Sequence, residues 1–351
     1  MLDREKNILD KALQVFHQNT GLTLLLESEA PANHLIDCTL KLVYRDEQAT
    51  LLATAIKQNV SKATAIYVMN QFELFRYKSN TTIPNLLISN YISENIAKEL
   101  IANNIFFIDC VGNSYLKTES VFVMILGQKR IMEKSYSKPK AFQSTGIKLL
   151  FALFIYKDLL NLSYREIAQF TGIATGSLSE ILNSLKENNF LLTLANGKRV
   201  LVNRKKLLEK FVIGYQEYLK PKLQSKKYKL LNNNLLSTWQ ELHLENTAVF
   251  WGGEPAAALQ TNYLQPEQLS IYTAIDRKEL LQLFRAVPDE KGNLEIQNVF
   301  WTKALQEFFP QKNCVPHLLS YVELVLSEDS RNLETANIIY EKYLSDFFES
   351  N

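Results

Sequence analysis

The sequence predicts an α+β protein of several domains: an N-terminal α/β domain, a central winged helix-turn-helix and a C-terminal α/β domain. In the first third of the chain, short apolar runs alternate with helical stripes, a pattern typical of α/β layers. Within residues 163–202, two short helical patterns are followed by a hairpin signal. The chain of 351 residues is long enough for two or three domains, each with its own core.

The composition is that of an ordinary globular protein. Hydrophobic residues make up 46% and charged residues 22% of the chain. No apolar run reaches the ~18–20 residues that a membrane-spanning helix needs, and the charged, amphipathic N-terminus does not resemble a secretory signal. The three cysteines are far apart and the four histidines are isolated, which argues against a structural zinc site. We therefore expect a cytoplasmic protein with no metal ion, no cofactor and no membrane contact.

Residues 1–20 are predicted to form an amphipathic helix, and residues 21–128 an α/β domain. Apolar side chains recur at helical spacing in the first segment, from Ile8 to Phe16. The expected elements that follow are strands at 21–27, 37–44 and 48–56, a helix at 61–76, a buried strand at 85–92, a helix that Ser93 caps at 93–104, and a second buried strand at 105–112. The basic stretch 127–144 contains Gly and Pro, which predicts a linker.

Residues 145–230 are predicted to form the winged helix-turn-helix and a basic tail. Thr145 is expected to cap the first helix; Ser163 caps the next, with Glu166 completing a capping-box pattern. Gly172 follows in the turn, where a left-handed backbone is favoured. The second helix of the motif has an apolar stripe, and "FLLTLANGKRVLV" then predicts a hairpin that turns at Asn196-Gly197.

The charge of the chain is concentrated in this central third. The whole chain has a net charge of +2, but Lys129–Leu230 contains 20 Lys and Arg against 7 Asp and Glu, a net charge of +13. The remainder of the chain therefore has a net charge of −11. Proteins that bind DNA neutralise its phosphates with Lys and Arg, so we expect this third to bind duplex DNA. A solvated basic face and a protein-binding winged helix are the alternatives.

The residues expected to contact DNA lie on the second helix of the motif, on the hairpin tip and just after the hairpin. Small hydroxyl side chains at the start of the helix permit close approach to base edges, and the cations are expected to contact phosphates. These residues are Thr175, Ser177, Ser179, Asn183, Lys186, Lys198, Arg199, Arg204 and Lys205. A palindromic operator would require a homodimer, for which residues 1–20 are the candidate pairing segment.

The stretches "LVYRDEQATLLATAIKQNVSKATAIYVMNQFEL" and "PNLLISNYISENIAKELIANNIFFIDCVGNSYL" resemble a restriction-endonuclease-like fold. In active members of that fold, a strand carries Glu-x-Lys and a preceding strand carries Asp, and the carboxylates hold Mg²⁺. Here the strand reads Ala55-Ile56-Lys57, so alanine takes the place of a metal ligand. We therefore expect a scaffold without catalytic residues, since Mg²⁺ needs several oxygen ligands.

Lys57 is then expected to be a surface cation or a contact to the DNA backbone, and Asp109 a turn carboxylate. The alternative is a divergent Mg²⁺-dependent nuclease that uses Asp37, Asp46 and Lys57.

Residues 239–351 are predicted to form the C-terminal α/β domain. In "GGEPAAALQTNYLQPEQLSIYT", two glycines precede a helix of small residues, which predicts close packing of helix on sheet. The two glycines are not a phosphate-binding loop, because no Lys-Ser/Thr follows them. In "SEDSRNLETA", Ser330 or Asn332 is expected to cap a helix, and Arg331 and Glu334 to form local ion pairs.

Four stretches occur in an order that is similar to the AbiEi-type antitoxin family of type IV toxin–antitoxin systems, described as transcriptional regulators. They are "NLLISNYISENIAKELIANNIFFIDCVGNSYL", the winged helix, "WGGEPAAALQTNYLQPEQLSIYT" and "LLSYVELVLSEDSRNLETANIIYEKYL", and the resemblance spans about residues 40–345. It implies a bacterial DNA-binding repressor whose partners are double-stranded DNA and a nucleotidyltransferase-like toxin encoded nearby. A protein-interaction module, in which the acidic C-terminal segment binds a toxin, is the remaining alternative.

Overall fold

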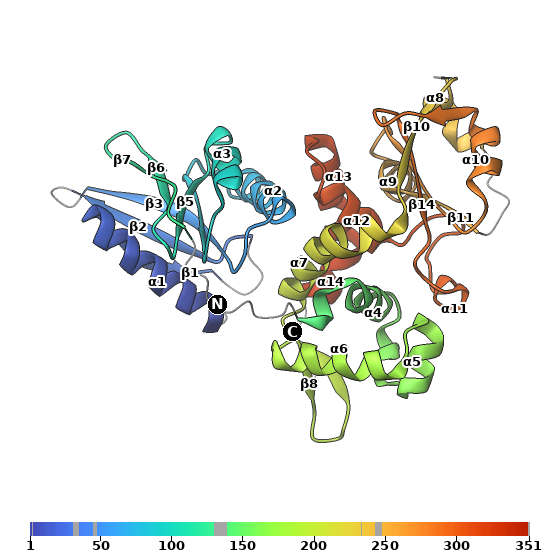
Figure 1. Cartoon of the computed structure of the whole chain (residues 1–351), viewed down its shortest axis with the longest axis horizontal. Helices are drawn as coiled ribbons and strands as arrows, with labels where there is room; N and C mark the ends of the chain where they lie inside the picture. Colours follow the sequence, from blue (N-terminus) through green and yellow to red (C-terminus); the bar gives the residue numbers. More distant parts are fainter. Residues whose placement is uncertain are drawn as a thin grey trace. The chain divides into compact units, whose positions relative to one another are not determined.

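The computed structural model describes residues 1, 3–30, 35–44, 48–129, 139–232, 234–242 and 248–349. The chain divides into two compact units, Met1–Tyr136 (unit 1) and Ser137–Asn351 (unit 2). Both contain sheets and helices, so the predicted mixed α+β character is confirmed (Figure 1). None of the helices in the described ranges has the length and apolarity that crossing a membrane would require.

Unit 1 is built on a seven-stranded sheet whose spatial order follows the chain. Strands β3, β4 and β5 pair in parallel because helices α2 and α3 make the crossovers between them, and the other neighbours pair antiparallel. The strands are β1 (Thr23–Glu29), β2 (Cys38–Tyr44), β3 (Gln48–Lys57), β4 (Asn85–Ser89), β5 (Phe106–Asp109), β6 (Ser114–Lys117) and β7 (Phe122–Ile125), and the two helices are α2 (Lys62–Ser79) and α3 (Glu94–Ala102).

Helix α1 (Asp3–Thr20) lies against this sheet and contacts β1, β3, β4 and β5. Its apolar stripe of Ile8, Leu9, Ala12 and Phe16 is buried in the core of unit 1. The helix predicted for residues 1–20 is confirmed, but its apolar face is already covered within the chain. The expectation that this face pairs two chains is therefore wrong.

Unit 2 begins with three α-helices and a hairpin. Helices α4 (Ser144–Ile155), α5 (Tyr164–Thr171) and α6 (Thr175–Glu187) are followed by strands β8 (Leu191–Thr193) and β9 (Arg199–Leu201), with 3₁₀ helices η1 (Lys140–Phe142) before α4 and η2 (Lys157–Asn161) after it. The capping box is confirmed: Ser163 Oγ accepts the Glu166 N–H at 3.3 Å, and the Glu166 carboxylate accepts the Ser163 N–H at 2.8 Å. Gly172 ends α5 with a φ of 69°, as predicted.

One detail of this region differs from the sequence prediction, whereas the predicted hairpin is present with Asn196-Gly197 in its turn. Helix α4 begins one residue before Thr145, with Gln143 as its N-cap, so Thr145 lies inside the first turn and caps nothing. The hairpin turns over three residues: the Leu194 N–H donates to the Lys198 carbonyl at 2.8 Å, and the Gly197 N–H to the Leu194 carbonyl at 2.9 Å. Gly197 has a φ of 78°, but Asn196 is not among the described residues with positive φ, which a two-residue turn through Asn-Gly would require.

The remainder of unit 2 surrounds a five-stranded sheet in the order β11-β12-β14-β10-β13. Its strands are β10 (Lys226–Leu230), β11 (Val249–Gly252), β12 (Leu269–Thr273), β13 (Ala286–Pro288) and β14 (Leu294–Asn298), and only β12 and β14 pair in parallel. The α-helices are α7 (Arg204–Gly214), α8 (Leu235–Thr238), α9 (Gly253–Thr261), α10 (Arg277–Phe284), α11 (Lys303–Gln306), α12 (His317–Val325), α13 (Ser330–Ile339) and α14 (Ser345–Glu349). The other helical segments are the π-helices η3 (Tyr215–Leu219) and η6 (Tyr340–Leu344) and the 3₁₀ helices η4 (Lys220–Leu223) and η5 (Trp239–Glu241). The basic tail expected after the hairpin is thus helix α7, segments η3 and η4, and strand β10.

Aromatic side chains join the helices of unit 2 to the segment that follows β14. Phe151 of α4 contacts Phe300 at 4.8 Å between ring centroids, and Tyr156 stacks on Phe308 at 4.2 Å. Thr302 Oγ1 also donates a hydrogen bond to the Phe170 carbonyl at the end of α5. These contacts fix α4 and α5 to the part of unit 2 that contains the five-stranded sheet.

Candidate nucleic-acid interface

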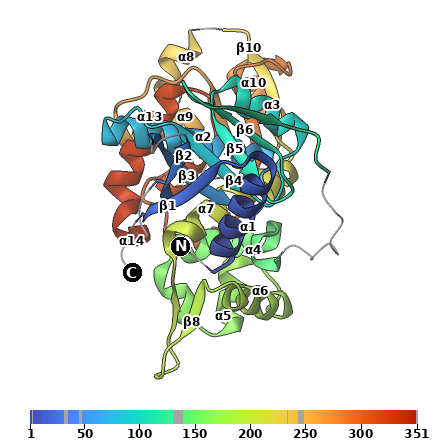
Figure 2. The ribbon, with the colours of Figure 1, turned by 90° about the vertical axis from the view of Figure 1, so that its left-hand side faces the viewer.

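One face of α6 is polar and largely exposed, and it carries several of the residues singled out from the sequence. Leu178, Ile181, Leu182 and Leu185 are buried on one side of the helix, as predicted. On the other side, Thr175, Asn183 and Lys186 are exposed and Ser179 is half-buried. A Cβ atom added at Gly176, in the first turn, would meet nothing within 4 Å. Figure 2 shows α5, α6 and the hairpin together at one end of unit 2.

Ser177 lies apart from the other polar residues of α6. It is half-buried and two positions from Thr175 and Ser179, and side chains at that spacing do not share a helix face. The row that faces outward is therefore Thr175, Ser179, Asn183 and Lys186, whose members are three or four positions apart.

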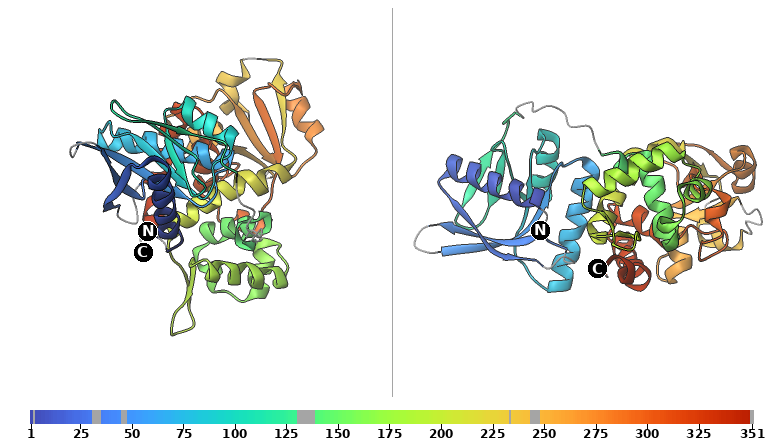
Figure 3. Two further views of the ribbon diagram at one scale, coloured as in Figure 1. Left: turned by 60° about the vertical axis from the view of Figure 1, so that its left-hand side comes forward. Right: turned by 90° about the horizontal axis from the view of Figure 1, so that it is seen from below.

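The hairpin projects beyond the helices of unit 2, as Figure 3 shows. Lys198 is exposed at its tip. Arg199 is half-buried: its guanidinium donates to the Leu162 carbonyl at 2.7 Å and lies 5.3 Å from the centroid of the Tyr164 ring. Arg199 thus braces the hairpin against the start of α5, while Lys198 remains accessible.

Arg204 and Lys205 contact the C-terminal helix of the chain. The Arg204 guanidinium donates to the Phe347 carbonyl at 2.8 Å and lies over the Phe347 ring, and Lys205 Nζ is 3.3 Å from a carboxylate oxygen of Glu349. Both side chains hold α7 against α14. Five of the nine candidates therefore lie on the outward row of α6 or at the hairpin tip: Thr175, Ser179, Asn183, Lys186 and Lys198.

Three charged residues near α6 were missed from the sequence. Arg165 is exposed in the first turn of α5. The sequence signal for this placement was available, because Arg165 follows the N-cap Ser163 by two residues. Lys140 was assigned to the linker 127–144, of which residues 130–138 lie outside the described residues, but it belongs to η1 and pairs with Glu180 at 2.6 Å. Glu180 is the third missed residue. No local sequence signal links Lys140 to Glu180, because they are 40 positions apart.

The basic charge of the central third is not all on this surface. Lys226, Lys227 and Lys229 are exposed on β10, which lies at the opposite end of unit 2 from the hairpin in Figures 1 and 2. The net charge of +13 therefore overstates the cations that α6 and the hairpin present together.

The strand end that resembles a nuclease site is closed in unit 1. Lys57 is only 7% exposed, and its Nζ lies 3.8 Å from Oδ2 of Asp37, which also accepts the Ile56 N–H at 2.8 Å. The expectation of a surface cation at Lys57 is therefore wrong: β3 buries the side chain beside a carboxylate that is 20 positions away in the sequence. Ala55 is buried, and Asp46 lies outside the described residues. Among the side chains that can be placed, no group of three His, Cys, Asp or Glu is arranged to hold a metal ion.

Asp109 is a turn carboxylate, as predicted. Its oxygens accept the backbone N–H groups of Ile92, Val111, Gly112 and Asn113 at 2.9–3.0 Å. Burial raises the pKa of the carboxyl, against the opposing effect of these donors. These contacts hold the loop between β5 and β6 and join it to Ile92, which lies between β4 and α3, so the residue has a structural role.

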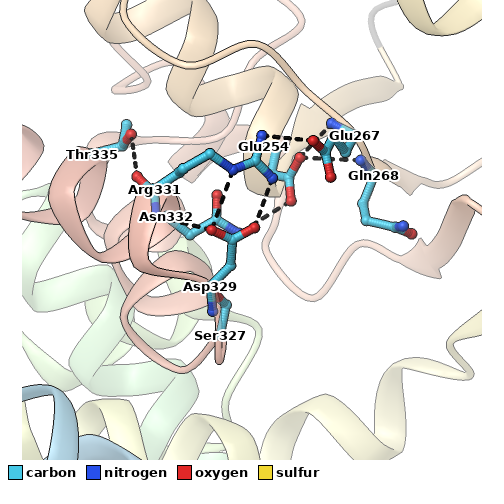
Figure 4. Close-up of polar contacts among 8 residues, drawn as sticks. All are labelled: Glu254, Glu267, Gln268, Ser327, Asp329, Arg331, Asn332 and Thr335. Carbon is cyan, nitrogen blue, oxygen red and sulfur yellow. Dashed lines mark hydrogen bonds and ion pairs between the residues drawn. The ribbon is translucent and has the colours of Figure 1, made fainter.

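The two most distinctive C-terminal motifs meet at Glu254 (Figure 4). Its Oε2 accepts the N–H groups of Glu267 at 2.6 Å and Gln268 at 3.0 Å, and its Oε1 accepts from Nδ2 of Asn332 at 3.1 Å. We call these four residues the Glu254 cluster. Both carboxylate oxygens bind groups of the chain itself, so the cluster fastens α9 and the start of β12 to α13.

Neighbouring residues of the cluster correct one expectation and confirm another. Helix α13 is capped by Asp329, whose side chain accepts the Arg331 N–H, and not by Ser330 or Asn332. The predicted local ion pair of Arg331 is present, with Asp329 at 2.7 Å, and a second pair joins Arg331 to Glu267 at 2.8 Å. The ion pair expected of Glu334 is not found among the described residues.

Close packing of helix on sheet is confirmed where α9 begins. A Cβ atom at Gly252 would lie 2.7 Å from the Tyr272 ring. Glu323 of α12 completes this junction by accepting the Gly253 N–H and the Tyr272 hydroxyl, both at 2.8 Å. Burial raises the pKa of the Glu323 carboxyl. The glycines therefore allow the turn from β11 into α9 to lie directly on a strand and a carboxylate.

Comparison with known protein families finds one match, which lies within unit 2. Residues 199–345 match the family described as "Transcriptional regulator, AbiEi antitoxin, Type IV TA system". The resemblance predicted from the C-terminal motifs is confirmed over these residues; the match begins at Arg199 and not near residue 40, so unit 1 has no family assigned. No curated protein and no solved structure matches the chain.

Proposed function

We propose, on the premise that residues 199–345 form a regulator domain of the AbiEi antitoxin family, that the protein is a DNA-binding repressor of a type IV toxin–antitoxin system. Helices α4–α6 and the hairpin β8–β9 would bind duplex DNA as a winged helix. The observation that carries the proposal is the open polar face of α6 beside an exposed hairpin lysine at one end of unit 2. The family description implies a cognate toxin as the second partner.

Helix α6 has the length and the polar face that a recognition helix needs. Recognition helices contact bases mainly through their N-terminal residues, which places Thr175 and Ser179 at base edges. Asn183, one turn further, has the side chain best suited to pair with adenine. Lys186 and Lys198 would neutralise phosphates on either side, and Arg165 would do so from the start of α5, the helix that crosses the backbone in such motifs.

Unit 1 serves in this proposal as a non-catalytic scaffold of restriction-endonuclease-like ancestry. The buried pair of Asp37 and Lys57 at the end of β3 supports the resemblance, and the alanine at residue 55 argues against a metal-dependent reaction. Incubating the protein with plasmid DNA and Mg²⁺ or Mn²⁺ tests this reading. Cleavage that disappears in Lys57→Met would favour the nuclease instead.

The proposal is tested by the salt dependence of binding to the DNA upstream of the gene. Replacing Lys198 by alanine is expected to weaken binding and to reduce the slope of log K against log [salt] by about 1, because one phosphate contact is lost. Lys226→Ala is the matched control, since it removes the same charge from an exposed lysine on β10.

Equal effects of Lys198→Ala and Lys226→Ala would show that the hairpin has no special role. A complete lack of duplex binding at low salt would contradict the proposed function as a whole.

A further inference from the structure

An acidic residue lies on the face of α6 that would approach DNA. Glu180 is four positions after Gly176 and three before Asn183, so all three share one side of the helix. Its side chain is 56% exposed, and its Oε2 is 2.6 Å from Nζ of Lys140, which is 57% exposed. Within the described part of the chain, no hydrogen bond is made to the other carboxylate oxygen, Oε1.

A carboxylate in this place is unfavourable for binding to DNA in general. It repels the phosphates that the neighbouring cations attract, and it lies in the half of α6 that reaches deepest into a major groove. The same carboxylate is an acceptor suited to one base edge: Glu and Asp accept a hydrogen bond from the N4 amino group of cytosine. The residue therefore lowers the affinity for arbitrary sequence and raises it where a cytosine is in reach.

Lys140 is held in place by contacts that precede any binding. It begins η1, in which Ala141 is fully buried and donates its N–H to Ser184 Oγ of α6 at 3.3 Å. The next residue, Phe142, packs its ring edge-on against Phe190 at 5.7 Å. Because η1 is anchored to α6, Lys140 can limit the rotamers of Glu180 and offset part of its charge before DNA arrives.

We propose that Glu180, oriented by Lys140, reads a cytosine in the major groove and so determines part of the operator sequence. This inference rests on the proposed function and names the base that α6 recognises. Glu180 is the specificity-determining residue, and Lys140 is the positioning residue that acts through it.

Selection of bound duplexes from a random library, carried out with the full chain and its variants, tests the inference. We expect the wild-type protein to enrich one position for cytosine. Glu180→Gln should move the preference at that position to adenine, because glutamine pairs with the N6 and N7 edge of adenine. Glu180→Ala should lower the discrimination at that position roughly tenfold while the rest of the motif is retained.

Two further variants separate orientation from charge. Lys140→Ala should keep cytosine as the preferred base but with weaker discrimination, since the carboxylate loses its orienting partner. Glu187→Gln is the matched control, because Glu187 is exposed on the same side of α6 but seven residues further from the N-terminus. Glu187→Gln removes the same charge roughly 10 Å further along the helix and should leave the selected DNA sequence unchanged.

The outcomes distinguish this inference from the function on which it rests. A wild-type protein that enriches no sequence contradicts the proposed function. A wild-type motif that Glu180→Gln and Glu180→Ala both leave intact contradicts the role of Glu180 alone. The same holds if both variants only strengthen binding to every sequence equally, as they would if the carboxylate acted by repulsion and nothing more.

Discussion

Replacing Glu254 by alanine is expected to destabilise unit 2 strongly. The side chain is 8% exposed, and its two oxygens accept the N–H groups of Glu267 and Gln268 and the amide of Asn332. Alanine removes the acceptor for all three donors at once. The loop before β12 and the first turn of α13 would then lose the group that joins them.

The three donors do not contribute equally to the expected loss. Glu267 and Gln268 are exposed, so water can reach their N–H groups once the carboxylate is gone. Asn332 is 5% exposed, and its amide would remain buried without a partner. A buried unpaired donor costs about 1–3 kcal/mol, and each hydrogen bond exchanged for water costs roughly 0.5 kcal/mol. We therefore expect the free energy of unfolding to fall by about 2–4 kcal/mol.

Urea unfolding followed by tryptophan fluorescence measures this loss selectively. All three tryptophans of the chain, at positions 239, 251 and 301, lie in unit 2, so the signal reports that unit alone. The urea concentration at the unfolding midpoint should fall, while the slope of the unfolding free energy against urea concentration stays the same. Glu328→Ala, an exposed acid beside the same helix, is the control and should change the stability by less than about 0.5 kcal/mol.

The reasoning is refuted if Glu254→Ala costs no more than the Glu328→Ala control. A double-mutant cycle with Asn332→Ala gives an independent measure. The two substitutions should be non-additive by at least about 0.5 kcal/mol, because they remove the two partners of one buried hydrogen bond. Full additivity would show that the contact drawn in Figure 4 contributes nothing.

Three further predictions concern single positions of unit 2. Gly252→Ala should cost about 1–3 kcal/mol in the same urea assay, because the new methyl group would press on the Tyr272 ring; an unchanged midpoint would contradict it. Burial lowers the pKa of His317, stacked on Tyr343, to about 4. The unfolded chain therefore takes up a proton between pH 6.5 and 4, and stability falls as the pH drops through this range. His317→Phe should keep the ring stacking on Tyr343. It should also remove roughly 1 kcal/mol of the decrease in unfolding free energy between pH 7 and 5, a figure kept small because the imidazole is partly exposed. Gly176→Ala should raise the free energy of unfolding by up to about 1 kcal/mol, with a slightly higher thermal midpoint. It should weaken DNA binding if the backbone of α6 approaches the duplex closely, and an unchanged affinity would argue against such an approach.

The sequence predicts local structure well wherever a neighbouring residue decides it. The Ser163–Glu166 capping box and the left-handed Gly172 depend only on residues within one turn, and both are present. Lys57 shows the limit: its burial depends on Asp37, which another strand brings alongside. Lys140 shows the same limit. The basic stretch 127–144, with one Gly and one Pro, predicts a linker, but the neighbours of Lys140 in η1 contact Ser184 of α6 and Phe190 just after it.

The aromatic contacts between the helices and residues 300–309 have a consequence for how this protein can be dissected. The rings of Phe151 and Tyr156 pack on Phe300 and Phe308. In the sequence, the first two residues precede all strands of the five-stranded sheet and the last two follow them. A fragment cut after the hairpin would leave these rings in water and invite aggregation. In the intact chain, a toxin or effector that displaced residues 300–309 would loosen the seat of α5. Under the proposed function, such a displacement would change DNA binding by α5 and α6 although the toxin or effector contacts neither helix.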